Sequence, residues 1–126
     1  MRLYMNNFEF SEGFKKRTQE FALRIIKLYK VLSMTAECQV IGKQLLRSGT
    51  SVAANYRAAC RARSKAEFLS KMSVVVEEAD ESVFWLELLT ATGIIPAKQL
   101  NSLLSEANEI LAIVSKAKKT MKFQNS

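Results

Sequence analysis

The sequence predicts an all-α protein, an antiparallel up-down-up-down four-helix bundle that forms a single domain over residues 1–126. Nearly half of the residues are apolar, yet the chain has only four glycines and one proline. A composition so poor in turn residues favours long helices over many short strands. Apolar residues recur at helical spacing in four stretches. The breaks between these stretches are short, so neighbouring helices must run antiparallel.

The first helix is predicted at about residues 12–33. Ser11 and Glu12 suit its start, and the other positions of the stretch are rich in lysine and arginine. The preceding residues, 1–12, mix aromatic side chains with asparagine and are expected to form a tail or an arm that docks on a neighbour. The apolar positions follow nearly heptad spacing and are Phe14, Phe21, Ile25, Leu28 and Leu32.

The second helix is predicted at about residues 36–63, with Thr35 as its N-cap. Gly49 costs roughly 1 kcal/mol relative to alanine inside a helix, so it indicates either a close approach of another helix or a kink. Asn55 borders the core on a helical wheel and is expected to bond a neighbouring helix or a loop. At 100° per residue, one side of the helix is apolar and carries Ile41, Leu45, Val52, Tyr56 and Ala59.

The third and fourth helices are predicted at about residues 65–92 and 96–119. Ser64 and Glu67 have the spacing of a capping box. Gly93 suits the left-handed position after a helix end, and Pro96 suits the first turn of the next helix. The expected core positions are Phe68, Met72, Val75, Ala79, Val83 and Leu86, then Leu100, Leu103, Ala107, Ile110, Val114 and Ala117.

Composition also limits the function classes. The chain has no histidine, so it lacks the usual general base and the commonest metal ligand. Cys38 and Cys60 are too few for a zinc motif and are expected to be buried free thiols in a reducing cytoplasm. No phosphate-binding loop or nucleophile–base pair is visible. We therefore expect a cytoplasmic protein that is not an enzyme, with no metal, no cofactor and no membrane partner.

The net charge of +7 is concentrated on the second helix, where residues 43–65 hold six basic residues and no acidic one. On a wheel with Lys43 at 0°, Arg61 falls at about 0°, Arg47 at about 40° and Arg57 at about 320°. This face could be merely solvated, could pair with acids, or could contact nucleic acid, since arginine binds phosphate and carboxylate alike. The candidate nucleic-acid-binding residues are Lys43, Arg47, Arg57, Arg61, Arg63 and Lys65.

The third helix is acidic, because residues 66–95 hold six acids and one lysine. Large apolar residues also lie away from its predicted core stripe, and exposed groups of this kind usually indicate an interface. Coverage by a loop or by the N-terminal arm is the alternative. The candidate oligomer interface consists of Glu77, Glu81, Phe84, Trp85 and Leu88.

Four runs of the sequence resemble a known family. They are residues 47–59 (RSGTSVAANYRAA), residues 64–68 (SKAEF), and residues 77–82 with 85–89 (EEADES and WLELL). They are similar to the bacterial four-helix bundle proteins encoded in intervening sequences of 23S ribosomal RNA genes, over about residues 14–118. The same fold is shared by the accessory variability proteins of diversity-generating retroelements.

This resemblance implies an antiparallel bundle that assembles into a pentameric ring. In the retroelement branch it also implies nucleic-acid binding and a reverse transcriptase as protein partner. Arg47, Asn55, Arg57, Ser64 and Lys65 match the family's motif positions, but the resemblance carries no established functional residues. The acidic third helix departs from a strongly basic ring.

Two functions follow as hypotheses. In the first, the protein is a ring-forming, non-enzymatic bundle that binds nucleic acid, in particular RNA, through phosphate contacts from its basic face. In the second, it is a protein-interaction scaffold whose basic face pairs with the acidic third helix of a neighbouring subunit. The partners of the arginine side chains distinguish the two.

Overall fold

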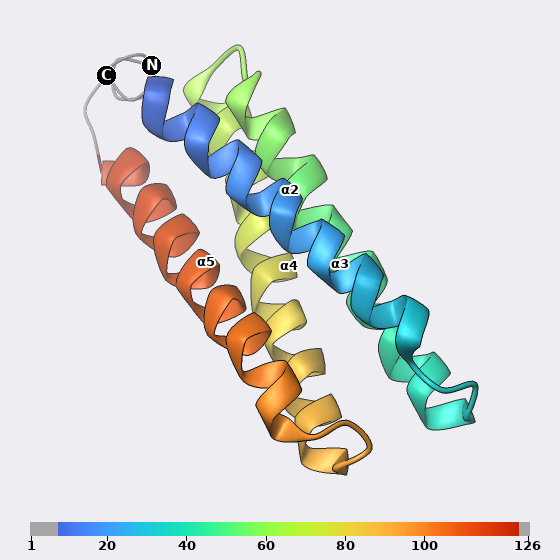
Figure 1. Ribbon diagram of the computed structural model, residues 1–126. Coiled ribbons are helices and arrows are strands. Elements are labelled where there is room, and N and C mark those ends of the chain that lie inside the picture. Colours follow the sequence, from blue (N-terminus) through green and yellow to red (C-terminus); the bar gives the residue numbers. More distant parts are fainter. Residues whose placement is uncertain (1–7, 124–126) are drawn as a thin grey trace.

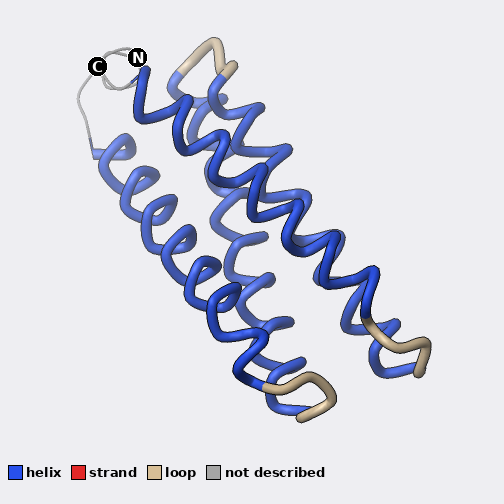
Figure 2. The backbone as a smooth tube through the Cα atoms, in the orientation of Figure 1, coloured by secondary structure: helices blue, strands red, loops and turns tan. Residues whose placement is uncertain are grey.

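A computed structural model describes residues 8–123 of the chain as four helices, α2 (Phe8–Val31), α3 (Ala36–Cys60), α4 (Lys65–Thr92) and α5 (Ala97–Phe123). The helices run alternately up and down, which confirms the predicted antiparallel four-helix bundle (Figure 1). Three short connections join them (Figure 2). The expected arm falls largely outside the described residues, and its last part, residues 8–12, belongs to α2.

The apolar stripes predicted for the four helices meet in the core. Nearly all of the predicted core residues are buried, and only Leu28 and Ala117, at the margins of their stripes, are partly exposed. Leu32, Cys38, Ile41, Leu89 and Leu100 form a second, smaller cluster, and Trp85 packs against both clusters. Cys38 and Cys60 are buried and form no disulfide. The helical periodicity of apolar residues was therefore a sufficient signal for the core.

Three helix boundaries differ from the prediction by three residues or more. The first helix begins at Phe8 rather than near residue 12, since Phe10 stacks on Phe14 one turn later at 5.9 Å between ring centroids. The second ends at Cys60 rather than residue 63, because the amides of Arg61 and Ala62 bond carbonyls three residues back, a tightened turn that ends the helix. The fourth continues from residue 119 to Phe123, because Met121 is buried.

The caps predicted from sequence are present in part. The Ser64 hydroxyl accepts a hydrogen bond from the Glu67 amide at 3.0 Å, as a capping box requires. Gly93 has a φ of 71°, the left-handed conformation that glycine adopts without a steric penalty. Thr35 stands at the N-cap of α3, but its side chain makes no cap hydrogen bond and lies 3.1 Å from the Ser33 hydroxyl oxygen instead.

Small residues allow the helices to approach closely. A Cβ atom at Gly49 would overlap the Cδ1 methyl of Ile25, so glycine is needed where α3 crosses α2. The Ser48 and Ser82 hydroxyl oxygens lie 2.9 Å apart where α3 meets α4, and both residues are fully buried. Asn55 was expected to bond another element. Its amide instead donates to the Ser51 carbonyl and hydroxyl oxygens within α3, at 3.0 and 2.9 Å.

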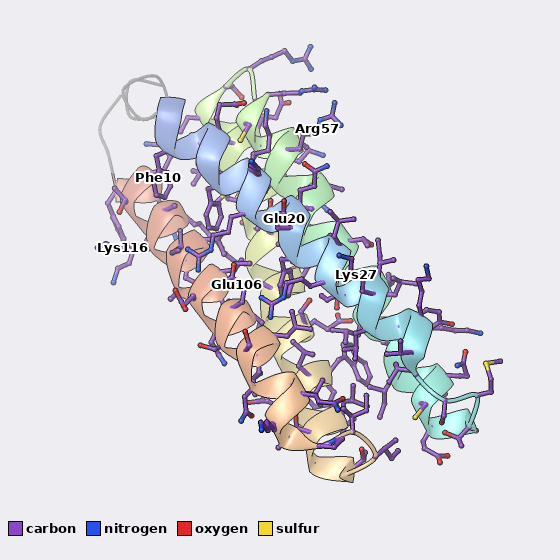
Figure 3. The ribbon with its side chains drawn as sticks, in the orientation of Figure 1. Phe10, Glu20, Lys27, Arg57, Glu106 and Lys116 are labelled. Atoms are coloured by element: carbon purple, nitrogen blue, oxygen red, sulfur yellow. The ribbon has the colours of Figure 1, made fainter. Side chains whose placement is uncertain are left out.

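The first and last helices are joined through an ion pair. Arg17 of α2 donates two hydrogen bonds of 2.7 Å to Glu106 of α5 and one of 3.0 Å to Glu109. These bonds raise the pKa of Arg17 despite its partial burial. Figure 3 shows Glu106 between these two helices. An ion pair therefore links α2 to α5, where the two helices make few other contacts, whereas α3 and α4 share an extensive apolar surface.

Candidate nucleic-acid interface

Two arginines at the end of α3 form the centre of the basic surface. Arg57 is one turn before Arg61, the C-cap residue, and both are exposed. Figure 3 shows Arg57 on the outer side of α3. Within residues 8–123 neither guanidinium is in an ion pair. Their donors are therefore available for an anionic ligand, and a guanidinium can bind phosphate with two parallel hydrogen bonds.

These arginines border a shallow groove of about 490 Å³ between α3 and the start of α4. Ala54 and Ala58 line it on the α3 side, so the side chains there are short. Glu67 and Lys71 line it on the α4 side. With three cations and one carboxylate, the groove has an excess of positive charge that suits a phosphate group.

Lys71 is a residue of this groove that the sequence prediction missed. It is the single lysine among the acids of residues 66–95 and lies one turn after Glu67. A signal was present, because the end of one helix and the start of the next are neighbours in an antiparallel hairpin. The wheel of the second helix could not include it, since it lies on a different helix.

Arg47 lies on the same side of α3 but is already paired. Its Nη1 donates to Glu78 Oε2 at 2.9 Å, and its Nη2 bonds Glu81 Oε2. Partial burial by itself would lower the pKa of Arg47, but the hydrogen bond to Glu81 and the charges of Glu78 and Glu81 outweigh it and raise the pKa. Both carboxylates belong to α4 of the same chain, so this part of the basic face is used within the subunit.

The other three predicted residues are spread along the surface. Lys43 is exposed but lies 14 residues before Arg57, about 21 Å along the helix. Arg63 is exposed in the turn after α3 and forms an ion pair with Glu67 at 3.6 Å. Lys65 is the partly exposed first residue of α4. The structure therefore brings Arg57 and Arg61 together with Lys71 and leaves Lys43 apart.

The predicted interface residues of α4 separate into two groups. Phe84 is 51% exposed and Leu88 is 37% exposed, and Glu77 is exposed on the same side. Trp85 was expected to project away from the core but is half-buried and packs against it. Its Nε1 donates to Glu81 Oε2 at 3.0 Å, which links it to Arg47. Phe84 contacts the Trp85 ring edge-on, at 4.8 Å between centroids.

A second hollow, of about 440 Å³, lies where α2 begins and α5 ends, the end at which Figure 3 labels Phe10 and Lys116. Its lining is mainly apolar and includes Tyr56, Phe68 and Met72. Lys116 is its one charged side chain among the described residues.

Comparisons with known proteins agree with this architecture. The family described as 23S rRNA-intervening sequence protein matches residues 13–116. A crystal structure of a protein of unknown function from the S23 ribosomal protein family of Bacteroides thetaiotaomicron superposes with a TM-score of 0.77 at 39% identity. The match covers 86% of this chain and 97% of that one.

No curated protein matches this sequence. Among the helices of residues 8–123, none is long and apolar enough to cross a membrane. The family match extends over all four helices and includes the groove between α3 and α4. The chain belongs to the family of 23S rRNA-intervening sequence proteins.

Proposed function

We propose that this protein is a non-enzymatic, self-associating helical bundle that binds nucleic acid, in particular RNA, through the groove between α3 and α4. The observation that carries the proposal is the pair Arg57 and Arg61, exposed at the groove and in no ion pair within the described residues. Lys71 adds a third cation from α4. Structured RNA would be recognised by its shape and backbone rather than by its bases.

Only part of the basic face suggested by the sequence would then bind nucleic acid. Arg47 contributes little to binding because two carboxylates already hold its guanidinium. Arg63 contributes less than Arg57 because Glu67 neutralises part of its charge. In this proposal the phosphate contacts are therefore concentrated where α3 ends and α4 begins.

The test is fluorescence anisotropy with a labelled structured RNA and a labelled DNA duplex, from about 50 mM to about 200 mM salt. Contacts from Arg57, Arg61 and Lys71 predict a slope of about −2.7 in log K against log salt on the duplex, at about −0.9 per phosphate. Arg57→Ala/Arg61→Ala should weaken binding to both ligands and reduce that slope by about 1.8.

The matched control is Lys116→Ala/Lys119→Ala. It removes the same net charge from two exposed positions of α5. If long-range attraction alone drove binding, both double variants would lose affinity equally. Binding at the groove predicts a larger loss of affinity for Arg57→Ala/Arg61→Ala than for the lysine variant. No binding of either nucleic acid at the lowest salt, where electrostatic attraction is strongest, would refute the nucleic-acid function.

The scaffold hypothesis is favoured by a different observation, the exposure of Phe84 and Leu88 toward the C-terminal end of α4. Exposed apolar side chains of this size are typical of contacts between proteins. We assign self-association to this face. If the scaffold were the whole function, Arg57→Ala/Arg61→Ala would lower the mass measured by light scattering. Under the nucleic-acid proposal that variant loses RNA affinity and keeps its mass.

A further inference from the structure

The net positive charge of residues 8–123 lies in one half of the bundle. Because the helices alternate in direction, α2 and α4 begin at the end where α3 and α5 finish (Figure 1). The three segments of this half, residues 8–19, 49–78 and 111–123, hold twelve basic and five acidic residues. The other half, residues 20–48 and 79–110, holds six basic and seven acidic residues. Attraction for a polyanion is therefore concentrated at one end of the molecule.

The last turns of α5 supply a third of the basic residues in this half. Residues 111–123 contain no acid and four lysines, Lys116, Lys118, Lys119 and Lys122. None of these lysines is in an ion pair within residues 8–123. Their charges are therefore as available to an external anion as those of the two arginines at the groove.

Two of these lysines lie on the side of α5 that faces α4. The opposite side of α5 faces α2, because Glu106 binds Arg17 there and Thr120 lines the hollow beside the start of α2. At 100° per residue, Lys118 and Lys122 lie about 120–160° around the axis from both Glu106 and Thr120. Lys118 is also only partly exposed, as expected beside a neighbouring helix. We call Lys118 and Lys122 the α5 lysine pair.

The start of α4 separates the α5 lysine pair from the groove. Lys71 faces α3, since it lines the groove together with Arg57. Lys71 is 21 residues before the end of α4 at Thr92, and Lys118 is 21 residues after the start of α5 at Ala97. An antiparallel pair with a short connection places these two lysines at the same level. Because α3 and α5 both pack on α4 but hardly touch each other, the groove and the pair flank α4 on opposite sides.

The outer surface of α4 between these two sets of cations is uncharged over its first two turns. Ala66 and Ser70 are exposed there, and their side chains are short. Glu77 is the next exposed residue along this face, about 10 Å beyond Ser70. A polyanion can therefore approach both sets of cations at the start of α4, and Glu77 limits how far it extends along the helix.

The separation of the two sets of cations suits a double helix with a wide, shallow groove. Neighbouring helices in a bundle stand about 8–10 Å apart, so the diagonal helices α3 and α5 stand about 11–14 Å apart. The minor groove of an RNA helix is wide and shallow, with a phosphate backbone on each side. The minor groove of B-DNA is only about 6 Å wide, and its major groove is about 8.5 Å deep, beyond the reach of alanine and serine.

We propose that double-helical RNA lies across the start of α4. One strand contacts Arg57, Arg61 and Lys71, and the other strand contacts the α5 lysine pair. This rests on the nucleic-acid binding proposed above, and it adds a second set of contacts and a preference for paired RNA. Because the contacts are to phosphates, the sequence of the RNA stem is not read.

The first test compares salt dependence on two ligands, an RNA hairpin and a DNA duplex, by fluorescence anisotropy. Five phosphate contacts predict a slope of about −4.5 in log K against log salt on the hairpin, if each contributes about −0.9 as on duplex DNA. The DNA duplex should keep the slope of about −2.7 that the groove alone predicts. A slope near −2.7 on both ligands would overturn the second set of contacts and leave binding at the groove intact.

The second test compares two lysine variants of α5 that remove the same charge. Lys118→Ala/Lys122→Ala should weaken hairpin binding by about tenfold and reduce the slope by about 1.8. Lys116→Ala/Lys119→Ala is the matched control and should weaken binding by less than about threefold, because Lys116 lies on the α2 side and Lys119 about 100° around the axis from Lys118. Equal losses from the two variants would overturn the role of the α5 lysine pair.

An unpaired uridine oligomer tests the requirement for two strands. A single strand cannot contact both sides of α4 at once, so Lys118→Ala/Lys122→Ala should change its affinity no more than the control does. A tenfold loss on this oligomer would contradict binding of a double helix. Loss of binding to anionic phospholipid vesicles, with hairpin affinity unchanged, would assign the lysines to a membrane surface and overturn the proposal.

Two further measurements keep these outcomes distinct. Lys118→Arg/Lys122→Arg keeps the charge and should bind the hairpin within about twofold of the original protein, because phosphate accepts either cation. Circular dichroism identifies any variant that fails to fold. An original protein that binds none of the nucleic acids at low salt would refute the nucleic-acid function itself, rather than the second set of contacts.

Discussion

The guanidinium of Arg47 on α3 is held by the carboxylate of Glu78 on α4, with Nη1 2.9 Å from Oε2 and 3.2 Å from Oε1. Glu81 bonds the same guanidinium, and Glu81 also accepts from the indole of Trp85. Four side chains are therefore connected across the α3–α4 contact. The basic face and the acidic helix, which looked like separate surfaces in the sequence, partly neutralise each other within one subunit.

Arg47→Ala should lower the free energy of unfolding by about 1 kcal/mol, the upper range for a half-exposed ion pair. The reason is that Glu78, with a side chain only 15% exposed, would lose its partner. The expected fall in melting temperature is about 4 °C. Arg57→Ala is the control and should change stability by less than about 0.5 kcal/mol. If urea unfolding gave equal losses of free energy for the two variants, the stabilising role assigned to the Arg47 ion pairs would be contradicted.

Gly49→Ala should destabilise the fold although alanine is the better helix former. The added methyl would overlap Ile25 Cδ1 in a fully buried site, and overpacking costs about 1–3 kcal/mol against about 1 kcal/mol gained in helix propensity. Gly13→Ala meets nothing within 4 Å in α2 and should stabilise by about 0.5–1 kcal/mol. Thermal unfolding of both variants compares the two sites directly.

The same contact can be tested by a double-mutant cycle. Ile25→Val removes the methyl that the new Cβ would meet, at a cost of about 0.5–1.5 kcal/mol when made alone. In the Gly49→Ala background it should cost less or even stabilise, since it relieves the overlap. Strict additivity of the two substitutions would show that the two side chains are not coupled.

Ser64→Ala should cost about 1 kcal/mol, the usual effect of losing an N-cap. Its hydroxyl accepts the Glu67 amide at the start of α4. Thr35 stands at the corresponding position of α3 without a side-chain cap bond, so Thr35→Ala should cost clearly less. Chemical denaturation with both variants measures the difference. A larger loss from the Thr35 variant would be inconsistent with the observed caps.

The buried hydroxyls of Ser48 and Ser82 should behave as a pair. Each single alanine substitution removes one hydrogen-bonding group from a fully buried contact and should cost about 1 kcal/mol. The double variant should cost less than the sum, because the hydrogen bond between the two hydroxyls is lost only once, and each hydroxyl can also donate to a carbonyl of its own helix. A cycle of denaturation free energies gives this coupling. If the double variant lost more stability than the two single variants together, the two serines would have a stabilising role beyond their shared hydrogen bond.

Much of the architecture was present in the sequence alone. The positions of Phe21, Val52, Met72 and Ile110 at helical spacing predicted which faces are buried. Ser64 and Gly93 marked two helix ends correctly, because a cap depends on neighbouring residues only. The family resemblance rested on runs of residues within single helices, and the family match confirms it.

The candidate site needed the tertiary structure. Arg47 and Arg57 share one helical face in the sequence, yet only the packing of α4 places Glu78 and Glu81 beside Arg47 and leaves Arg57 exposed. Lys71 joins the groove for the same reason, since it comes from another helix. A helical wheel describes the angle of a side chain about its own axis. It contains no distance to another helix, and ion pairs and grooves depend on that distance.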